Sequence, residues 1–302
     1  LAPSRALVIL WLLALPVAAL GGWFAATRVT ERSVLRCTAA FAWAVAPTFL
    51  VALVEGRPAA VILHLALPWL VYTATAARRS WSSAGLASIL LVIVVACAPS
   101  LAPALGVLWL VALILAIVVR RGRGAGRIIW LVIPSIAVFL PLVWYHLTTG
   151  DPLAVFADPG RPLAVAGNPD GLLPKILFAF GYPSTDGAGW LQFLGEDGRA
   201  WWVAAFTAPV LVLALLGPVL GRLLPASLAL VAAGLGVATA VLASGIALTA
   251  GSSGPVAIWP GSALSLAWAG LLLAAVAGLD GFRRVDALVP VAASLVIAFL
   301  AI

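Results

Sequence analysis

The sequence predicts an all-α fold, a polytopic transmembrane helical bundle, and two observations carry this prediction. The 302 residues are 64% hydrophobic and only 9% charged, with a mean hydropathy of +1.19. Soluble globular domains have a charged fraction of about a quarter. In addition, apolar runs of about 20 residues, the length that crosses a bilayer, recur along the whole chain. We therefore treat residues 1–302 as one transmembrane helical domain that uses lipid as its solvent.

The apolar runs predict about ten spans in chain order. They cover residues 6–26, 38–54, 58–77, 84–98, 101–119, 128–148, 200–220, 226–249, 261–279 and 286–302. The first run continues to Ala26 and meets an arginine-bearing loop, which favours a spanning helix over a cleaved signal peptide. The turns at 55–58 and 99–103 are tight enough to predict two helical hairpins. Either all four spans between 38 and 119 cross the membrane, or one hairpin re-enters or lies along the interface.

The charged residues alternate from loop to loop, and this alternation orients the bundle. Four arginines fall between Arg120 and Arg127, and we predict that this loop is cytoplasmic. Twelve of the 17 basic residues then lie on the cytoplasmic side: Arg28, Arg32, Arg36, Arg78, Arg79, Arg120, Arg121, Arg123, Arg127, Arg222, Arg283 and Arg284. The polar stretch 149–199 becomes one long external loop. The protein is thus expected in the cell membrane as a multi-pass protein.

The net charge of +7 predicts a lipid partner and not a nucleic acid. The arginines are scattered through short loops and form no basic face with interleaved aromatic residues. Anionic lipid headgroups are the partner that such loops meet at a membrane surface.

Four residues of the third run share one helix face. His64, Pro68, Tyr72 and Thr75 recur at spacings of three and four residues. They can pack against neighbouring helices, with the polar groups bonded to backbone carbonyls. They can also line a polar cavity, because ionisable groups at membrane depth often mark functional sites. His64 and Tyr72 are therefore candidate substrate-binding residues.

Proline and small residues predict how individual helices bend and pack. Pro134 and Pro141 should bend the sixth span twice. The Gly217 to Gly221 segment and the series Gly270, Ala274 and Gly278 predict seams where two helices approach closely.

The ends and the cysteines add two expectations. The chain contains no methionine and stops inside an apolar run, so we expect the natural protein to be longer. Cys37 and Cys97 fall at opposite membrane faces in the predicted topology, so no disulfide is expected between them.

The external loop 149–199 contains the candidate catalytic residues. Carboxylates can bind a divalent cation or act as a base toward a sugar acceptor, and five are candidates: Asp151, Asp158, Asp170, Glu196 and Asp197. Arg161 and Lys175 could bind phosphate, and Trp190 could stack on a sugar face. The alternative is a solvated connection, since Asp-Pro and Asn-Pro pairs also form turns.

The sequence lacks the common phosphate, dinucleotide and zinc motifs. It contains no GxxxxGK[ST], no GxGxxG opening a helix, no HExxH and no Cys/His cluster with metal spacing. We therefore expect no cofactor and no metal site in this chain, although a divalent cation could serve a longer enzyme.

Several short strings resemble the membrane region of large actinobacterial family 2 glycosyltransferases. They are Ala42-Trp-Ala-Val-Ala-Pro47, Glu55-Gly-Arg-Pro58 leading to His64-Leu-Ala-Leu-Pro-Trp69, Ala96-Cys-Ala-Pro-Ser-Leu-Ala-Pro103, and Pro141-Leu-Val-Trp144 followed by Gly150-Asp-Pro-Leu153. In that family a nucleotide-sugar-dependent catalytic domain precedes a polytopic region. The passage from Gly56 to Trp69 is also similar to membrane-embedded GT-C arabinofuranosyltransferases, which use polyprenyl-phosphate sugars.

The resemblance departs from both families where catalysis is concerned. The Asp-x-Asp metal motif of family 2 is absent, so that domain would lie upstream of Leu1. The acidic pair in the first external loop of GT-C enzymes has no counterpart at Glu55, and Glu196-Asp197 lies in a later loop. No catalytic residue is carried over.

Two functions of different classes follow. The chain can be the membrane domain of a cell-envelope glycosyltransferase that anchors and presents a polyprenyl-linked sugar or an envelope glycan. It can instead be a transporter or flippase-like protein without transferase chemistry. A transporter built on inverted repeats should show internal symmetry. The sequence shows interrupted helices only in its first half and no repeat, which favours the glycosyltransferase.

Overall fold

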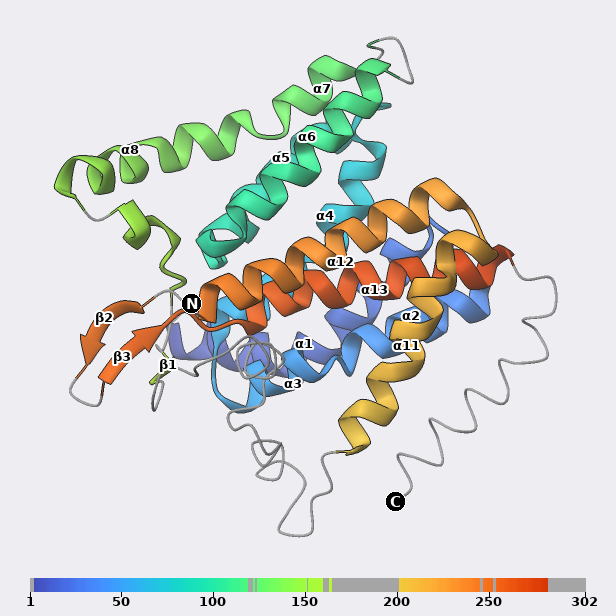
Figure 1. The fold of residues 1–302 in the computed structure, drawn as a ribbon, viewed down its shortest axis with the longest axis horizontal. Helices are drawn as coiled ribbons and strands as arrows, with labels where there is room; N and C mark the ends of the chain where they lie inside the picture. Colours follow the sequence, from blue (N-terminus) through green and yellow to red (C-terminus); the bar gives the residue numbers. More distant parts are fainter. Residues whose placement is uncertain are drawn as a thin grey trace.

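The computed structural model describes residues 3–118, 122, 124–150, 152–159, 163–164, 201–244, 247–251 and 254–281 (Figure 1). Its helices are α1 (Pro3–Ala26), α2 (Ser33–Ala44), α3 (Pro47–Val54), α4 (Pro58–Ala77), α5 (Trp81–Cys97), η1 (Pro99–Leu101), α6 (Ala102–Val118), α7 (Ala125–Trp130), α8 (Ile133–Thr149), η2 (Pro152–Phe156), α11 (Trp201–Leu220), α12 (Leu223–Ser244) and α13 (Gly261–Gly281). Its strands are β1 (Leu163–Ala164), β2 (Ala247–Gly251) and β3 (Gly254–Ala257).

The predicted bundle of long apolar helices is confirmed. Among the described residues, 7 helices or helix pairs are long and apolar enough to cross a membrane: Ser4–Ala26, Ser33–Val54, Pro58–Ala77, Pro99–Val118, Ala125–Thr149, Leu223–Ser244 and Gly261–Gly281. Each of them coincides with a predicted apolar run. The helices Trp81–Cys97 and Thr207–Leu220 are apolar but shorter. The predicted run 286–302 lies outside the described residues, so the count of ten stays a prediction.

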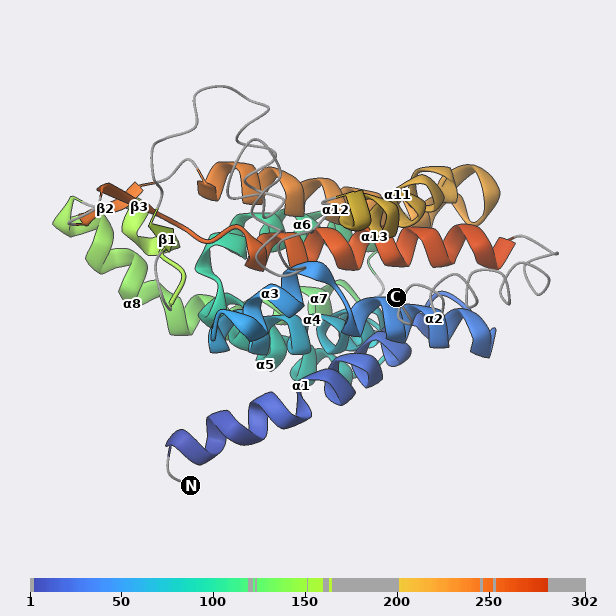
Figure 2. The same ribbon diagram turned by 90° about the horizontal axis from the view of Figure 1, so that it is seen from below.

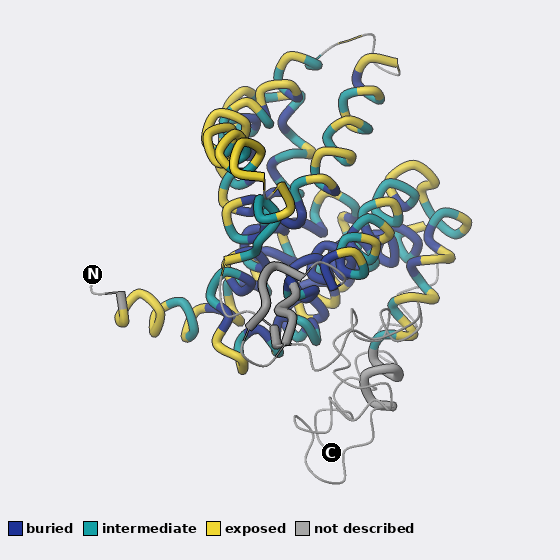
Figure 3. The backbone as a smooth tube through the Cα atoms, turned by 60° about the vertical axis from the view of Figure 1, so that its left-hand side comes forward, coloured by how far each residue is buried: buried dark blue, intermediate teal, exposed yellow. Residues whose placement is uncertain are grey.

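Helix α13 is the centre of the bundle. Within its apolar window 83% of the residues are buried, against 50% or less in the other six spans. Figure 2 shows α12 and α13 in one layer, α2, α3 and α4 in the layer beneath, and α1 outermost. Burial is concentrated where these layers meet, whereas α8 and the first turns of α1 are largely exposed (Figure 3). Lipid would cover these exposed apolar surfaces.

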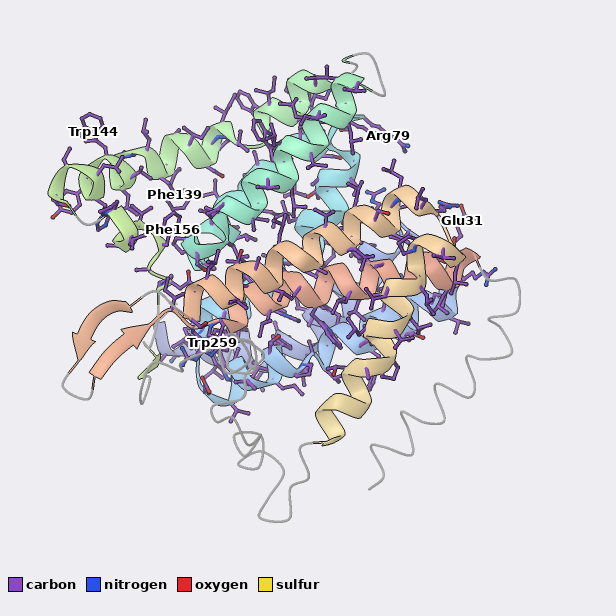
Figure 4. All side chains as sticks on the ribbon, in the orientation of Figure 1. Glu31, Arg79, Phe139, Trp144, Phe156 and Trp259 are labelled. Carbon is purple, nitrogen blue, oxygen red and sulfur yellow. The ribbon has the colours of Figure 1, made fainter. Side chains whose placement is uncertain are left out.

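The turns between helices gather at two ends of the bundle. One end, called the arginine-rich end, contains the turns at 27–32, 78–80 and 221–222. The other, called the Asp158 end, contains the turns at 55–57 and 98–101, the segment 152–159 and the sheet. Figure 4 labels Glu31 and Arg79 at the first end and Trp144, Phe156 and Trp259 at the second. Successive turns therefore lie at alternate ends of the bundle, as the predicted topology requires, whichever end faces the cytoplasm.

A small antiparallel sheet at the Asp158 end was not predicted. Its strand order is β1-β3-β2, with Leu163 paired to Ala257 and Gly251 paired to Gly254. The predicted run 226–249 was therefore too long: α12 ends at Ser244 and β2 occupies Ala247–Gly251. The sequence Gly251-Ser-Ser-Gly254 is a hairpin-turn signal that overrides the apolar continuity of the run.

The glycine seams are confirmed by backbone contacts. A Cβ atom on Gly217 would lie 2.5 Å from the carbonyl oxygen of Ala274, and one on Gly278 would lie 2.7 Å from the Cα atom of Gly217. A Cβ atom on Gly270 would lie 2.5 Å from the carbonyl oxygen of Ala229. Only glycine lets α11 and α12 approach α13 this closely.

Two spans are interrupted at proline. The sixth span breaks between α7 and α8, and Pro134 stands in the first turn of the new helix. Pro141 lies inside α8, which continues through it as one helix. The second span breaks between α2 and α3, immediately before Pro47. Pro47 has no N–H group to extend the hydrogen-bond ladder of α2.

Candidate functional site

The Asp158 end is organised by one carboxylate that bridges two helix starts. Asp158 follows η2 and is half-buried. Its Oδ1 atom accepts a hydrogen bond from the backbone N–H of Ser100 at 3.1 Å, and its Oδ2 atom accepts one from the Ser100 hydroxyl at 3.0 Å. The Ser262 hydroxyl, in the first turn of α13, also donates to this carboxylate. The beginning of loop 149–199 is thereby tied to the bundle.

The local sequence explains why the carboxylate sits there. Pro99 starts η1, so the N–H of Ser100 lies in its first turn, where helical N–H groups have no partner within the helix. The start of α13 likewise presents the positive end of a helix dipole, which attracts an anion. Asp158 supplies that anion to both helix starts.

Burial raises the pKa of Asp158 to about 6, while the hydrogen bonds from Ser100 and Ser262 act in the opposite direction. Desolvation disfavours the charged form and is the larger effect here. A carboxyl group with a pKa in this range can hold or release a proton near neutral pH, as a general acid or base must.

A second group of side chains lies at the same end. The guanidinium of Arg57, which is buried, lies 4.8 Å from the centre of the Trp259 ring, and its Nε atom is 2.5 Å from Oε2 of Glu55. Gly56, between them, has a φ of 67°, a conformation that favours glycine and allows the tight turn. The Trp259 ring lies against Gly261, where a Cβ atom would overlap it.

Both groups lie at the start of α13. Trp259 is two residues before the first residue of this helix, and Ser262, a partner of Asp158, is in its first turn. A carboxylate can accept bonds from sugar hydroxyls, an indole ring can stack on a sugar face, and a guanidinium can bind phosphate. The Asp158 end therefore combines the groups that recognise a phosphorylated sugar.

A polar centre lies inside the bundle, where α2 gives way to α3. The helix α2 has 12 residues and is about 18 Å long. At its end the Ala42 carbonyl loses its helical partner, because the Ala46 N–H donates to the Trp43 carbonyl at 3.2 Å instead. The indole N–H of Trp268 donates to the Ala42 carbonyl at 3.0 Å. His64 Nε2 lies 3.1 Å from the Trp43 carbonyl, to which it must donate. Side chains from α13 and α4 thus complete the interrupted ladder.

His64 is held on all sides. It is 0% exposed, and its ring is stacked on Trp43 at 3.9 Å and on Phe49 at 4.3 Å between ring centres. Since both rings are nearly parallel to the imidazole, they lie on its opposite faces. Nδ1 is 3.1 Å from the Ser265 hydroxyl, which donates to a neutral ring. Both imidazole nitrogens therefore have partners, as the packing interpretation of the stripe expects.

The rest of the stripe runs from this interior to the arginine-rich end. Pro68 is buried, Tyr72 is half-buried, and Thr75 is exposed with its hydroxyl bonded to the carbonyls of Val71 and Tyr72. The guanidinium of Arg28 lies 3.8 Å from the centre of the Tyr72 ring. The four residues share a helix face but do not share one environment.

Most of the predicted loop residues fall outside the described residues. These are Asp151, Arg161, Asp170, Lys175, Trp190, Glu196 and Asp197. Of the ten candidate site residues only His64, Tyr72 and Asp158 can be placed, and they lie in separate regions. Across the described part of the chain, no group of three or more His, Cys, Asp and Glu side chains could hold a metal ion.

Sequence reasoning did not select several residues that the structure brings to these regions. Ser100 and Ser262 each follow a proline or glycine at a helix start, a pattern that marks them as helix-start donors but does not identify their partner. Trp259, Trp268 and Ser265 come from the run around α13, far in sequence from what they contact. Their roles depend on long-range packing that no local pattern reveals.

Comparisons of the chain with models of known protein families, with curated proteins and with solved structures find no match. The resemblance to glycosyltransferase membrane regions therefore stays a prediction. The side chains at the Asp158 end support a function more directly than this resemblance does.

Proposed function

We propose that this chain is the membrane domain of a cell-envelope glycosyltransferase and that its Asp158 end binds the polar head of a polyprenyl-phosphate-linked sugar. The arginine-rich end then faces the cytoplasm and the Asp158 end faces outward, as the arginine distribution favours. The catalytic domain that uses the presented sugar belongs to a longer protein.

One observation supports this proposal most directly. The Asp158 carboxylate and the Arg57–Trp259 pair both lie at the start of α13, the most buried of the candidate spans in the described residues. A rigid helix start is a suitable base for recognition because its groups lose little freedom on binding. The apolar outer surfaces of the bundle can lie beside a polyprenyl chain, while its head reaches this end.

The three side chains have separate roles in the proposal. Each oxygen of a carboxylate has more than one lone pair, so Asp158 can accept a sugar hydroxyl while it remains bonded to Ser100. Arg57 donates an N–H group to a phosphate oxygen, and Trp259 stacks on the sugar ring. Glu55 restrains the guanidinium through their short contact.

Binding to the intact protein in nanodiscs tests this function. A polyprenyl phosphate with its sugar is compared with the same lipid lacking the sugar. Asp158→Asn and Trp259→Leu should weaken binding of the sugar-bearing lipid about tenfold, or about 1.4 kcal/mol, and leave the sugarless lipid within about twofold. Tenfold is about the smallest loss of affinity expected when one hydrogen bond to a charged group is removed.

Asp280→Asn is the matched control. Asp280 accepts a bond from the Thr30 hydroxyl at the arginine-rich end, so the change removes a comparable carboxylate–hydroxyl contact far from the proposed site. It should leave binding of both lipids unchanged. If Asp158→Asn and Trp259→Leu bind the sugar-bearing lipid as tightly as the parent, the Asp158 end does not recognise the sugar.

A second function, transport or lipid flipping, is favoured by the interruption between α2 and α3. Broken helices inside a membrane commonly form substrate sites in transporters. Liposomes containing the protein and a fluorescent polyprenyl-linked sugar in both leaflets distinguish the two functions. Quenching of only the outer-leaflet fluorescence supports presentation without transport, whereas quenching of nearly all of it within minutes supports a flippase.

A further inference from the structure

We propose that the arginine-rich end carries a binding site for an anionic phospholipid, with Arg28 and Tyr72 at the phosphate and Leu20 and Phe24 along the acyl chain. This site, called the Arg28 site, is independent of the function proposed for the Asp158 end. It differs from general attraction between arginine loops and a membrane because its guanidinium is fixed in position.

The Arg28 guanidinium is held by two contacts on one residue. Its Nε–H group donates to the backbone carbonyl of Tyr72 at 3.0 Å, and its central carbon lies 3.8 Å from the centre of the Tyr72 ring. A guanidinium has five N–H donors, of which Nε supplies one. No hydrogen bond joins the four terminal donors of Arg28 to another described residue, so they remain for a ligand, and the residue is exposed.

No carboxylate in the described part of the chain neutralises Arg28. The ion pair found there joins Arg57 and Glu55 at the other end of the bundle. Two acids lie at this end: Glu31, three residues after Arg28, and Asp280, which accepts a bond from the hydroxyl of Thr30, and neither forms an ion pair with Arg28 among the described residues. The fixed terminal N–H groups match the oxygens of a phosphate, which planar guanidinium forks bind in pairs.

Arg36 adds a second cation at the same turn. Its Nε–H group donates to the carbonyl of Thr30 at 3.0 Å, so this guanidinium is also anchored through Nε. Like Arg28, it has no carboxylate partner among the described residues. The turn between α1 and α2 therefore presents two guanidinium groups anchored in the same manner.

Apolar side chains on α1 indicate a lipid as the ligand. Leu20 and Phe24 are 54% and 37% exposed, and with Arg28 they are spaced four residues apart, on one face of the helix and its final turn. The Phe24 ring contacts Trp69 at 5.2 Å and Tyr72 at 5.7 Å between ring centres. The stripe leads from the bilayer interior to the guanidinium, which is the layout of an acyl chain below a headgroup. Free phosphate would contact only the Arg28 guanidinium and would leave Leu20 and Phe24 without a partner.

Native mass spectrometry of the whole chain, released from nanodiscs that mix phosphatidylglycerol with phosphatidylcholine, tests this site. The parent should retain phosphatidylglycerol in preference to phosphatidylcholine. Arg28→Gln should reduce retention of phosphatidylglycerol about tenfold and leave phosphatidylcholine unchanged. Millimolar inorganic phosphate should not displace the bound lipid.

Two further variants make the result decisive. Arg28→Lys keeps the charge but loses the planar fork, so its retention should lie between those of the parent and Arg28→Gln. Arg222→Gln removes an exposed arginine at the same end of the bundle and should change retention less than twofold. Equal losses for Arg28→Gln and Arg222→Gln would show general charge attraction and overturn the site, and displacement by inorganic phosphate would overturn its assignment to a lipid.

Discussion

Two glycines on α12 allow a sharp test of the packing between α12 and α13. A Cβ atom on Gly236 would lie 2.5 Å from the backbone nitrogen of Ala267 and 2.8 Å from the carbonyl oxygen of Ala263. A Cβ atom on Gly234, two residues earlier, would meet nothing within 4 Å. Since ordinary contact begins at 3.4 Å, alanine at position 236 must move the two helices apart by about 0.9 Å.

The expected cost follows from this displacement. Overpacking a close interface costs about 1–3 kcal/mol. Alanine also gains up to about 1 kcal/mol of helix propensity over glycine, at either position. The propensity gain cancels when Gly236→Ala is compared with Gly234→Ala. We therefore expect the two variants to differ by about 1–3 kcal/mol in the free energy of unfolding. This corresponds to about a 5-fold to 150-fold difference in the ratio of folded to unfolded protein.

Reversible unfolding by sodium dodecyl sulfate in mixed micelles, followed by circular dichroism, measures this difference. Gly234→Ala should be at least as stable as the parent, and Gly236→Ala clearly less stable. Gly236→Val, with a larger side chain, should be the least stable of the three. Equal stability of Gly234→Ala and Gly236→Ala would show that the backbones of α12 and α13 are not in close contact at Gly236, and would refute the prediction.

Three further predictions concern topology, the interior and the loop. In cells carrying a protein without Cys37 and Cys97, a cysteine at Asn168 should react with an impermeant reagent, and reaction only after permeabilisation would reverse the orientation. His64→Leu should insert normally but lose about 1–3 kcal/mol of stability, because it removes the buried imidazole hydrogen bonds to the Trp43 carbonyl and the Ser265 hydroxyl; unchanged stability would contradict this. Because burial raises the pKa of Asp158 from 3.8 to about 6, the folded state binds more protons than the unfolded state between these pH values, and stability should decrease as pH rises through them. The difference between the parent and Asp158→Asn isolates this dependence, and a constant difference from pH 4 to pH 6 would refute it.

The helices were predictable because the bilayer restricts what a chain can do. Within hydrocarbon each backbone group must be paired inside the protein, so an apolar run such as 58–77 has essentially one available conformation. The seam around Gly270 and Gly278 was predictable for a related reason. In lipid, helices associate through close backbone approach, which small residues permit.

The sheet and the side-chain partners were not predictable from local pattern. Residues 247–251 continue the predicted run of α12, and a short, mostly apolar segment fits a strand as well as a helix end. Trp268 and the Ala42 carbonyl are 226 residues apart, and their contact depends on the whole bundle. Asp158 was selected as an acid of the loop, but its bonds to Ser100 required a fold that returns 58 residues to the same end.

The interruption between α2 and α3 bears on which function the bundle can support. The carbonyls of Trp43 and Ala42 at the break accept hydrogen bonds from His64 on α4 and Trp268 on α13, and the His64 ring lies between Trp43 and Phe49, one from each side of the break. Movement of α3 away from α2 would remove the Phe49 ring from one face of the His64 imidazole and uncover a buried polar ring in a medium without water. Since α13, which supplies Trp268 and Ser265, is the most buried helix, it cannot follow α3 without disturbing its contacts with α11 and α12. An interruption closed in this way stiffens the bundle, and a stiff bundle suits a domain that presents a substrate better than one that must alternate between two open states.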